Sequence, residues 1–420
     1  MGKASERRQR WRFVGAAGLV IILAATLRPE PDQTRAAEAT PLWCLVCGDH
    51  GGVDVINNIL LFIPFALGLR LGGVPRKTVL LAGAASSLAI ELLQLTVIAG
   101  RDASLSDVLT NSLGTGVGAL LADYGSTLLH PSERRARVLA ASAAVLWLGL
   151  QGLTAVLLRP WIPDGPLRSE WHPDPPGRVP FTGELLSAQV AGLAVPDGEV
   201  PAQDQLPTRL AAGMLEVEIQ ITSAAAQSKW SSVYQLVGQR GTLLLVEAFR
   251  GHLIFQPPSR AQALRLRSPR LLIADALSQR RSEIRLVAGE RNDTVWARSA
   301  PRDIRAVYPL SPSQSWTLIS PFTYTSGRAT RIITAIWLAL ALVPIGYWLT
   351  RAFPGAGVLG VSALLLTLGL GVVPLLFGYP SDQWSEWVGG ALGLVAGCAV
   401  GNGGSYFGKR CDSPSIRESC

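Results

Sequence analysis

The sequence has few charged residues and few cysteines for its length. Only 16% of its 420 residues are charged, whereas a soluble domain usually carries about 25%, so the composition excludes a purely cytosolic protein. Five Cys exclude a disulfide-stapled scaffold, and the 48% hydrophobic content excludes a disordered chain. The mean hydropathy of +0.29 is modest for a protein made only of membrane helices. The composition therefore predicts apolar segments combined with a sizeable soluble part.

The common catalytic and metal-binding motifs are also missing from the sequence. It contains no Gly-x-Ser-x-Gly elbow, no His-Glu-x-x-His and no phosphate loop, and its four His have no ligand spacing. Gly114-x-Gly116-x-Gly118 lies in an apolar stretch, which favours helix packing over a dinucleotide loop. We expect no metal, no cofactor and no nucleic-acid partner, and a non-enzyme is the favoured reading. The net charge of +8 must first be placed relative to a membrane.

Eight stretches approach the roughly 20 mostly apolar residues that a membrane-spanning helix needs. They are Phe13–Leu27, Val53–Leu71, Thr78–Ile98, Asp107–Tyr124, Val138–Leu158, Ala329–Leu349, Ala356–Phe377 and Glu386–Val400. The first follows a basic run at residues 7–12, a pattern that also begins a signal peptide. No small-x-small cleavage site follows closely, so we interpret this stretch as an uncleaved first helix.

The basic residues predict the orientation, because short cytoplasmic loops are enriched in Lys and Arg. With the N-terminus inside, the inside loops carry Arg7, Arg8, Arg10, Arg12, Arg76, Lys77, Arg134, Arg135, Arg137, Arg351, Lys409 and Arg410. The short outside loops carry only Arg28, Arg35 and Arg101. This alternation predicts a multi-pass membrane protein with both termini in the cytoplasm.

The one long connection, Arg159 to Arg328, is predicted to lie outside the cytoplasm and to be rich in β-strand. It begins with a Pro-rich linker, and in Met214–Ile221 the apolar residues alternate with polar ones. Further strands are expected at Ser232–Val237, Thr242–Ala248, His252–Gln256, Ile284–Ala288, Thr294–Arg298 and Trp316–Ile319. Many short strands separated by turn residues are typical of a β-sandwich.

The predicted fold is therefore mixed: a polytopic α-helical membrane domain of about eight helices with an inserted extracytoplasmic all-β sandwich. Residues 1–158 form the first five helices, and 159–328 form the linker and the sandwich. Residues 329–403 form the last three helices, and 404–420 form a cytoplasmic tail.

Polar residues within the apolar stretches are candidate functional residues, because the bilayer makes buried polar groups costly. Three pairs share a helix face, and one cation lies in the short loop that follows the second pair: Asp54 with Asn58, Glu91 with Gln94, Asp107 with Asn111, and Arg101. All lie at the outer side in the predicted topology. We expect Glu91 to pair with Arg101 in an outward-facing pocket. The alternative is that the acids are helix N-caps and the amides only join helices.

These residues resemble a known family. The pattern Asp54-x3-Asn58-x3-Phe62-x-Pro64-x3-Gly68, followed by Glu91-x2-Gln94-x6-Arg101-x-Ala-Ser104-x2-Asp107-x3-Asn111-x2-Gly114-x3-Gly118, looks like the VanZ-like family over residues 40 to 125. The resemblance implies a bacterial cytoplasmic-membrane protein with a link to glycopeptide (teicoplanin) resistance, but it names no reaction. The long insert is similar to laminin-G and concanavalin-like lectin domains, on Phe181-Thr-Gly183, the strand spacing and the segment Trp316–Phe322.

The sequence also contains an internal echo. Residues Ser106–Gly118 can be laid over Ser385–Gly397 without gaps, with an acid at the start and Gly spaced by four. Gly389, Gly393 and Gly397 would let a neighbouring helix approach closely. Chance similarity between two Gly-rich helices is the alternative, and the second copy lacks equivalents of Arg101 and Asn111.

Cys44 and Cys47 are predicted to lie outside the cytoplasm, where a structural disulfide can form. Two free thiols are the alternative.

The main functional hypothesis is an envelope membrane protein that binds or handles an envelope lipid or glycan and affects glycopeptide susceptibility. The ligand-binding candidates are Asn58, Glu91, Gln94, Arg101, Asp107 and Asn111, supported by Asp54, Pro64, Gly114 and Gly118. The alternatives are a membrane-anchored carbohydrate-binding sensor or scaffold, and an enzyme or transporter for a lipid-linked substrate.

Overall fold

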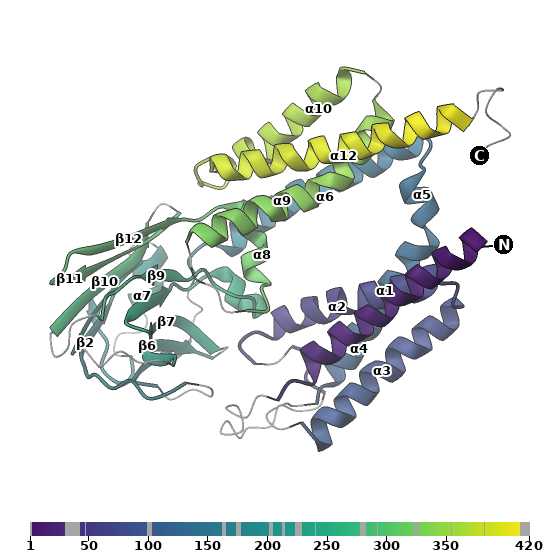
Figure 1. Ribbon diagram of the computed structural model, residues 1–420. Coiled ribbons are helices and arrows are strands. Elements are labelled where there is room, and N and C mark those ends of the chain that lie inside the picture. Colours follow the sequence, from purple (N-terminus) through teal and green to yellow (C-terminus); the bar gives the residue numbers. More distant parts are fainter. Residues whose placement is uncertain are drawn as a thin grey trace.

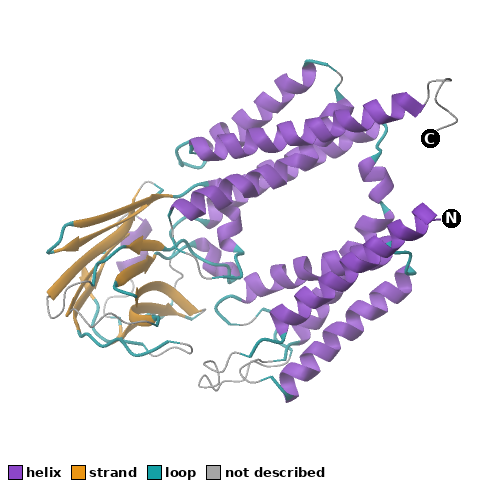
Figure 2. Cartoon of the chain, in the orientation of Figure 1, coloured by secondary structure: helices purple, strands orange, loops and turns teal. Residues whose placement is uncertain are grey.

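The structure, a computed structural model, consists of two groups of helices and a β-domain (Figures 1 and 2). It describes residues 2–29, 43–46, 48–98, 103–161, 165–173, 178–200, 205–211, 215–222, 229–239, 241–277, 283–291, 293–322, 325, 327–353, 355–381 and 383–411. Arg101 and Cys47, both named in the sequence predictions, lie outside these residues.

Two groups of helices extend from the same side of the β-domain. The N-terminal unit comprises α1 (Gly2–Thr26), α2 (Gly51–Leu71), α3 (Arg76–Thr96) and α4 (Leu105–Asp123). The short α5 (Gly125–Leu129) leads to the C-terminal unit, which comprises α6 (Glu133–Leu157), α9 (Arg328–Ala352), α10 (Gly357–Leu366), a π-helical stretch at Thr367–Val372, α11 (Val373–Leu376) and α12 (Trp384–Cys411). The N-terminal end of α1 and the C-terminal end of α12 lie far from the β-domain (Figure 1).

Five of the described helices are long and apolar enough to cross a membrane, so the expected number of eight spans is corrected to five. They are α2, α3, α6, α9 and the continuous segment Gly357–Leu376. The other three predicted spans do form helices, namely α1, α4 and α12. They lack an apolar stretch as long as those of the five, because α1 carries the basic run, and α4 and α12 contain many Gly and polar residues.

The β-domain consists of two six-stranded antiparallel sheets. One has the order β4-β1-β6-β7-β8-β9 and the other β12-β11-β10-β5-β2-β3. The strands are β1 (Arg168–Trp171), β2 (Leu185–Val190), β3 (Leu193–Ala194), β4 (Gly198–Glu199), β5 (Leu215–Thr222), β6 (Ser231–Gly238), β7 (Gly241–Phe249), β8 (His252–Gln256), β9 (Leu271–Ile273), β10 (Glu283–Arg291), β11 (Thr294–Ala300) and β12 (Ile304–Pro309). The helical turns are α7 (Gln205–Ala211), Arg260–Leu264, Pro312–Gln314 and α8 (Ser315–Leu318).

The strands predicted by alternation are confirmed in β5, β6, β7, β8, β10 and β11, but the strand predicted at Trp316–Ile319 is wrong. Residues 316–318 lie in α8, and Ile319 directly follows that helix. The side chain of Ser311 accepts a hydrogen bond from the Ser313 N–H (3.1 Å), and Pro312 stands at the first helical position, which suits its fixed φ angle.

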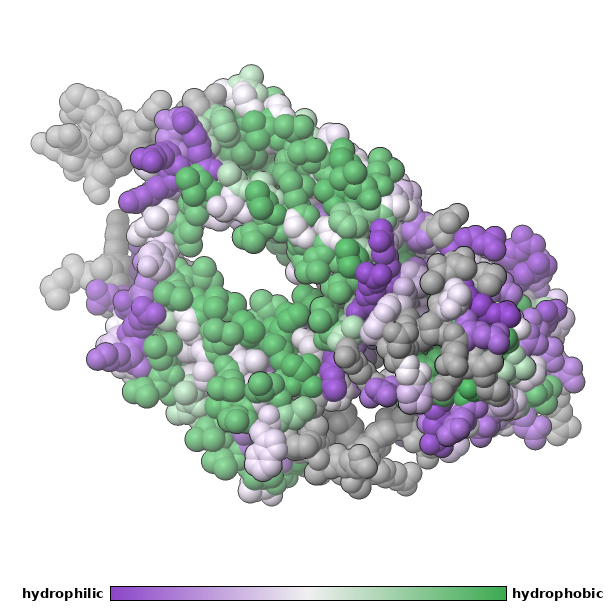
Figure 3. Space-filling model, turned by 180° about the vertical axis from the view of Figure 1, so that it is seen from behind, coloured by the Kyte–Doolittle hydropathy of each residue, from purple (hydrophilic) through white to green (hydrophobic). Residues whose placement is uncertain are grey.

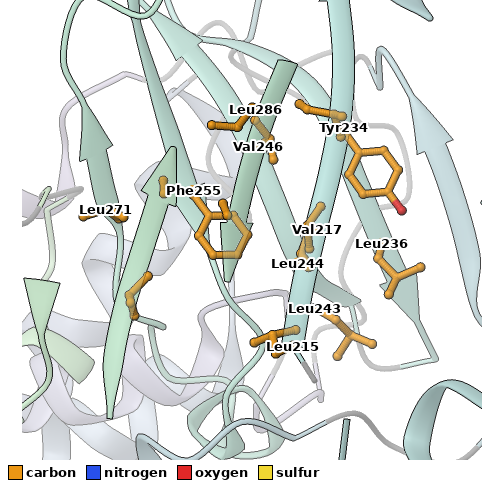
Figure 4. Close-up of a cluster of buried hydrophobic side chains, with 14 of the residues drawn as sticks. Leu215, Val217, Tyr234, Leu236, Leu243, Leu244, Val246, Phe255, Leu271 and Leu286 are labelled. Carbon is orange, nitrogen blue, oxygen red and sulfur yellow. The ribbon is translucent and has the colours of Figure 1, made fainter. Parts of the chain in front are cut away.

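The domain core lies between the two sheets. In β5, Leu215, Val217, Ile219 and Ile221 are buried, whereas Glu216 and Gln220 are exposed. Figure 4 shows Leu215, Val217 and Leu286 of one sheet together with Leu244, Val246 and Phe255 of the other. The cluster continues into the helices through Val53, Ala155 and Leu158.

Two pairs of helices pack closely through glycine. A Cβ atom on Gly114 or Gly118 of α4 would come within 2.2 Å or 2.5 Å of the Ile59 or Ile63 carbonyl oxygen in α2. On Gly393 or Gly397 of α12 it would come within 2.3 Å or 2.1 Å of the Ala339 or Val343 carbonyl oxygen in α9. Glycine is therefore required for both approaches.

The two pairs have the same register. Gly393 and Gly397 follow Gly114 and Gly118 by 279 positions, and the carbonyls that they approach follow Ile59 and Ile63 by 280. In each pair the second carbonyl directly precedes a proline within the helix, Pro64 in α2 and Pro344 in α9. The similarity of residues 106–118 to residues 385–397 is thus accompanied by a similar packing of α4 on α2 and of α12 on α9.

Candidate functional site

The most polar group of buried residues in the N-terminal unit lies near the β-domain end of α3 and α4. Glu91 and Gln94 of α3 are 6% and 7% exposed, and Asn111 of α4 is 2% exposed. These three sequence-predicted residues share the interior with Ser87, which is fully buried one turn before Glu91. Sequence reasoning missed Ser87, although its spacing of four from Glu91 places both on one helix face.

Glu91 holds the residue at which α4 begins. Its Oε2 accepts a hydrogen bond from the backbone N–H of Ser104 (2.6 Å). Ser104 is the N-cap of α4, and its Oγ accepts a hydrogen bond from the Ser106 N–H (3.1 Å). The carboxylate therefore fixes the end of the preceding loop. The predicted ion pair with Arg101 involves a residue outside the described structure and stays a prediction.

Asn111 connects α4 with α3. Its Nδ2 donates to the Ser87 Oγ (2.9 Å), and Ser87 in turn donates to the Asp107 carbonyl oxygen (3.5 Å). The Asn111 Oδ1 is buried and has no hydrogen-bond partner in the described part of the chain. Asp107 itself lies in the first turn of α4, where a carboxylate favours the positive helix end.

Gln94 connects α3 with α1. Its Nε2 donates to the Thr26 carbonyl oxygen (3.0 Å) at the last residue of α1, a group that has no partner within its own helix. The Gln94 Oε1 is buried and without a hydrogen-bond partner among the described residues. Two residues after Ser104, the Ser106 Oγ donates to the Leu45 carbonyl oxygen (2.6 Å) and ties the segment before α2 to α4.

The site thus offers acceptors. Two buried amide oxygens have no partner among the residues that the structure describes, and a buried acceptor without a hydrogen bond costs about 1–3 kcal/mol. The Glu91 carboxylate and these two amide oxygens can each receive a hydrogen bond from a hydroxyl or ammonium group. The described structure joins Glu91, Gln94, Asp107 and Asn111 through α3 and α4.

Asp54 and Asn58 lie on α2, whereas the other polar candidates that the structure describes lie on α3 and α4. Asp54 is exposed in the first turn of α2, and Asn58 is half-buried. The neighbouring Asn57, which sequence reasoning did not select, donates from Nδ2 to the Ile319 carbonyl oxygen (3.1 Å) and ties α2 to the segment after α8. Gly114 and Gly118 serve the packing of α4 on α2, whereas Pro64 of α2 is exposed. Cys44 takes part in a disulfide, and its predicted pairing with Cys47 falls outside the described residues.

The C-terminal unit has apolar residues at the corresponding positions. Gly390 follows Asn111 by 279 positions, and a Cβ atom there would lie 2.9 Å from Leu366 and 3.4 Å from Leu370. Those leucines follow Ser87 and Glu91 by the same 279 positions. The same helix packing is therefore compatible with an apolar interior, so packing alone does not require Ser87, Glu91 and Asn111 to be polar.

A second buried polar cluster lies in the β-domain and was not predicted. Glu247 of β7 is 0% exposed and forms ion pairs with Arg178 (Nε–Oε1, 2.7 Å) and Arg270. Both guanidinium groups lie 5.5 Å from the ring centre of Trp230, which stacks on Phe249 at 4.6 Å. Sequence alternation gives no signal for this cluster, because its members come from separate segments.

Comparison with known proteins identifies the first part of the chain. Residues 8–126 match the family model described as VanZ/LLP1. No curated protein and no solved structure matches the chain. The match covers α1 to α4 except for the first residues of α1, so the N-terminal unit is VanZ-like. Together with the five helices that are long and apolar enough to cross a membrane, this match supports a membrane protein that carries a VanZ-like domain.

Proposed function

We propose that the VanZ-like unit binds the polar headgroup of an envelope lipid or glycan at the group formed by Glu91, Gln94 and Asn111. The observation that carries this proposal is that the buried amide oxygens of Gln94 and Asn111 have no hydrogen-bond partner among the described residues, on the same two helices as the buried Glu91 carboxylate. The apolar residues at the matched positions of the C-terminal unit support it, because helix packing alone does not explain the polar ones.

In this proposal each side chain has a stated role. Gln94 and Asn111 accept hydrogen bonds from headgroup hydroxyls, and Glu91 orients the loop that precedes α4. Arg101 supplies a cation whose planar fork suits a phosphate or carboxylate, and Asn58 borders the entrance from α2. Binding of a cell-wall precursor lipid in this way would alter the response to glycopeptide antibiotics.

The proposed topology places the site and the β-domain outside the cytoplasm of a bacterial inner membrane. The basic residues of the short loops support it. The position of the β-domain also supports it, because this domain lies at the opposite end of the helix units from the N-terminal end of α1 and the C-terminal end of α12 (Figure 1).

The test replaces Ser87, Glu91 and Asn111 by the residue types found at the matched positions of the C-terminal unit, which are Leu, Leu and Gly. We expect the triple variant Ser87→Leu, Glu91→Leu, Asn111→Gly to keep its helix packing and to bind polyprenyl phosphate at least tenfold more weakly, as measured by native mass spectrometry of the full chain. Ten-fold corresponds to about 1.4 kcal/mol, close to one buried hydrogen bond. Asn57→Ala is the matched control, since it removes an amide outside the group. Unchanged lipid binding in a folded triple variant would contradict the proposal.

A membrane-anchored scaffold whose lectin-like β-domain binds polysaccharide is the second candidate. The arginine–tryptophan cluster favours it, because the half-buried Trp230 lies beside Arg178, whose side chain is 26% exposed. Polysaccharide binding that is lost in Trp230→Ala but retained in the triple variant would favour this function. Turnover or flux in proteoliposomes would instead indicate an enzyme or a transporter for a lipid-linked substrate.

A further inference from the structure

An opening passes through the molecule between the two helix units. Figure 3 shows it in the space-filling view, bordered largely by apolar side chains. In Figure 1 the N-terminal unit lies on one side and the C-terminal unit on the other, with the β-domain at one end and α5 at the other. We call it the central opening.

Contacts from α2 and α9 close the β-domain end of the central opening. Asn57 of α2 donates to the Ile319 carbonyl oxygen, directly after α8. Trp337 of α9 follows Asn57 by the 280 positions that relate the two helices, and its Nε1 donates to the Ser315 Oγ in α8 (3.1 Å). Equivalent positions of the two helices therefore both contact the segment around α8, which lies between them at this end.

The opposite end is closed by α5. Tyr347 of α9 donates from its hydroxyl to the Leu129 carbonyl oxygen. Trp348 donates from Nε1 to the Leu128 carbonyl oxygen (2.9 Å). The linker between the two units is thus held against α9, at the end remote from the β-domain.

Between the two ends of the central opening, the face of α2 that contains Asn57 and the face of α9 that contains Trp337 carry exposed apolar side chains. We call these faces the stripes. Leu60 of α2 follows Asn57 by three positions and is 48% exposed, and its counterpart Leu340 of α9 follows Trp337 by three and is 66% exposed. Pro64 and Pro344, one turn further along each stripe, are exposed as well. Residues three and four apart share a helix face, so these four side chains continue the stripes that face α8.

The four exposed residues of α2 and α9 that lie between the two ends of the central opening are apolar, and this favours an apolar occupant. Both α2 and α9 are long and apolar enough to span a membrane, and when they span one, the opening between them is at the level of the hydrocarbon core. Water in the opening would contact leucine and proline side chains. Lipid hydrocarbon would instead cover this apolar surface, which gains a free energy of about 25 cal/mol per Å² removed from water.

We propose that the central opening binds the acyl chains of phospholipids from the surrounding bilayer, held between α2 and α9. Phospholipid is favoured over a polar ligand because the stripe residues between the closures, Leu60, Pro64, Leu340 and Pro344, are all apolar. This site lies on the stripe of α2 that faces α8, and the polar group lies between α3 and α4. The proposal therefore does not depend on the proposed headgroup site.

The test fills the central opening with larger side chains. The full chain is purified in mild detergent, and retained phospholipid is counted by native mass spectrometry. Leu60→Trp combined with Leu340→Trp should lower the retained phospholipid at least about fivefold. Leu81→Trp is the matched control, because Leu81 of α3 is 71% exposed and α3 does not border the opening (Figure 1). Equal phospholipid retention in the unchanged chain, the double variant and the Leu81→Trp control would overturn the proposal. A retained polyprenyl-linked lipid in place of phospholipid would overturn it as well.

A second measurement keeps the proposal testable if the double variant does not fold. A spin label at Leu340→Cys, in a chain whose free thiols are replaced by Ser, is placed in liposomes of phosphatidylglycerol and phosphatidylethanolamine. We expect relaxation by oxygen and none by a water-soluble nickel chelate. Relaxation by the nickel chelate would show a water-filled opening and would contradict lipid binding there.

Discussion

At the residue scale, Glu290 is a buried acid for which the described part of the chain supplies no ion pair. It lies in β10 and is 6% exposed, and its Oε2 has no hydrogen-bond partner in the described structure. Burial, and secondly the charge of Asp293, raises the pKa of Glu290 to about 8. The proton on Glu290 is therefore held more tightly in the folded protein than in the unfolded chain.

This shift predicts the sign of a pH dependence. Between the ordinary carboxyl pKa of 4.5 and about 8, the folded state binds more protons than the unfolded state, so the free energy of unfolding falls as pH rises. We expect the thermal midpoint to fall between pH 5 and pH 8, and Glu290→Gln to flatten that decline. Glu218→Gln is the control, because a hydrogen bond from Arg285 lowers the pKa of Glu218 and moves its titration below this range. A slope that Glu290→Gln leaves unchanged would contradict the assignment.

The polar residues of the site show what a sequence can reveal at this scale. Glu91, Gln94 and Asn111 were identified because a polar residue in an apolar stretch is costly, and all three are buried. Ser87 and Thr26 were missed, because small hydroxyl residues and backbone carbonyls are common in helices and give no such signal. Partners of this kind depend on how helices meet, which hydropathy does not describe.

At the element scale, the glycines of α4 differ in what surrounds them. A Cβ atom on Gly114 would meet the Ile59 carbonyl oxygen at 2.2 Å, whereas on Gly116 it would meet nothing within 4 Å. Gly114→Ala should therefore push α4 away from α2 and lower stability by about 1–3 kcal/mol. Gly116→Ala should be neutral or stabilising by up to about 1 kcal/mol, since Ala favours helix. Thermal unfolding of the two variants measures the difference, and equal midpoints would contradict the close packing of α2 and α4.

Regular patterns predicted elements well, and local capping decided the exceptions. Alternation identified β5 because one face of that strand is buried. The segment at Trp316–Ile319 is equally apolar, but the Ser311–Pro312 start makes it helical. Glycine spacing predicted a close neighbour for α12, yet only the folded chain shows that this neighbour is α9 and that its register repeats that of α2.

At the scale of the whole molecule, the β-domain and the helix units are joined. The hydrophobic core of the two sheets includes Val53 of α2 and Leu158 at the end of α6. Asn57, Gly48 and Asp49 add polar contacts to Ile319, Arg265 and Thr242 of the β-domain. The linker sequence predicted a separate sandwich, but burial across this junction depends on which apolar residues meet and could not be read from the strand pattern.

This arrangement gives a direct test of topology. Ser132 precedes α6 among Arg134, Arg135 and Arg137, at the end of the helix units remote from the β-domain, whereas Asp197 lies in the β-domain. Because cytoplasmic loops are enriched in Arg, we expect Ser132→Cys to react with a membrane-impermeant maleimide only after cells are opened. Asp197→Cys should react in intact cells, in a chain whose free thiols are replaced by Ser. Labelling of Ser132→Cys in intact cells, with Asp197→Cys protected, would reverse the orientation and place the Glu91 group on the cytoplasmic side, where it could not meet an outer-leaflet headgroup.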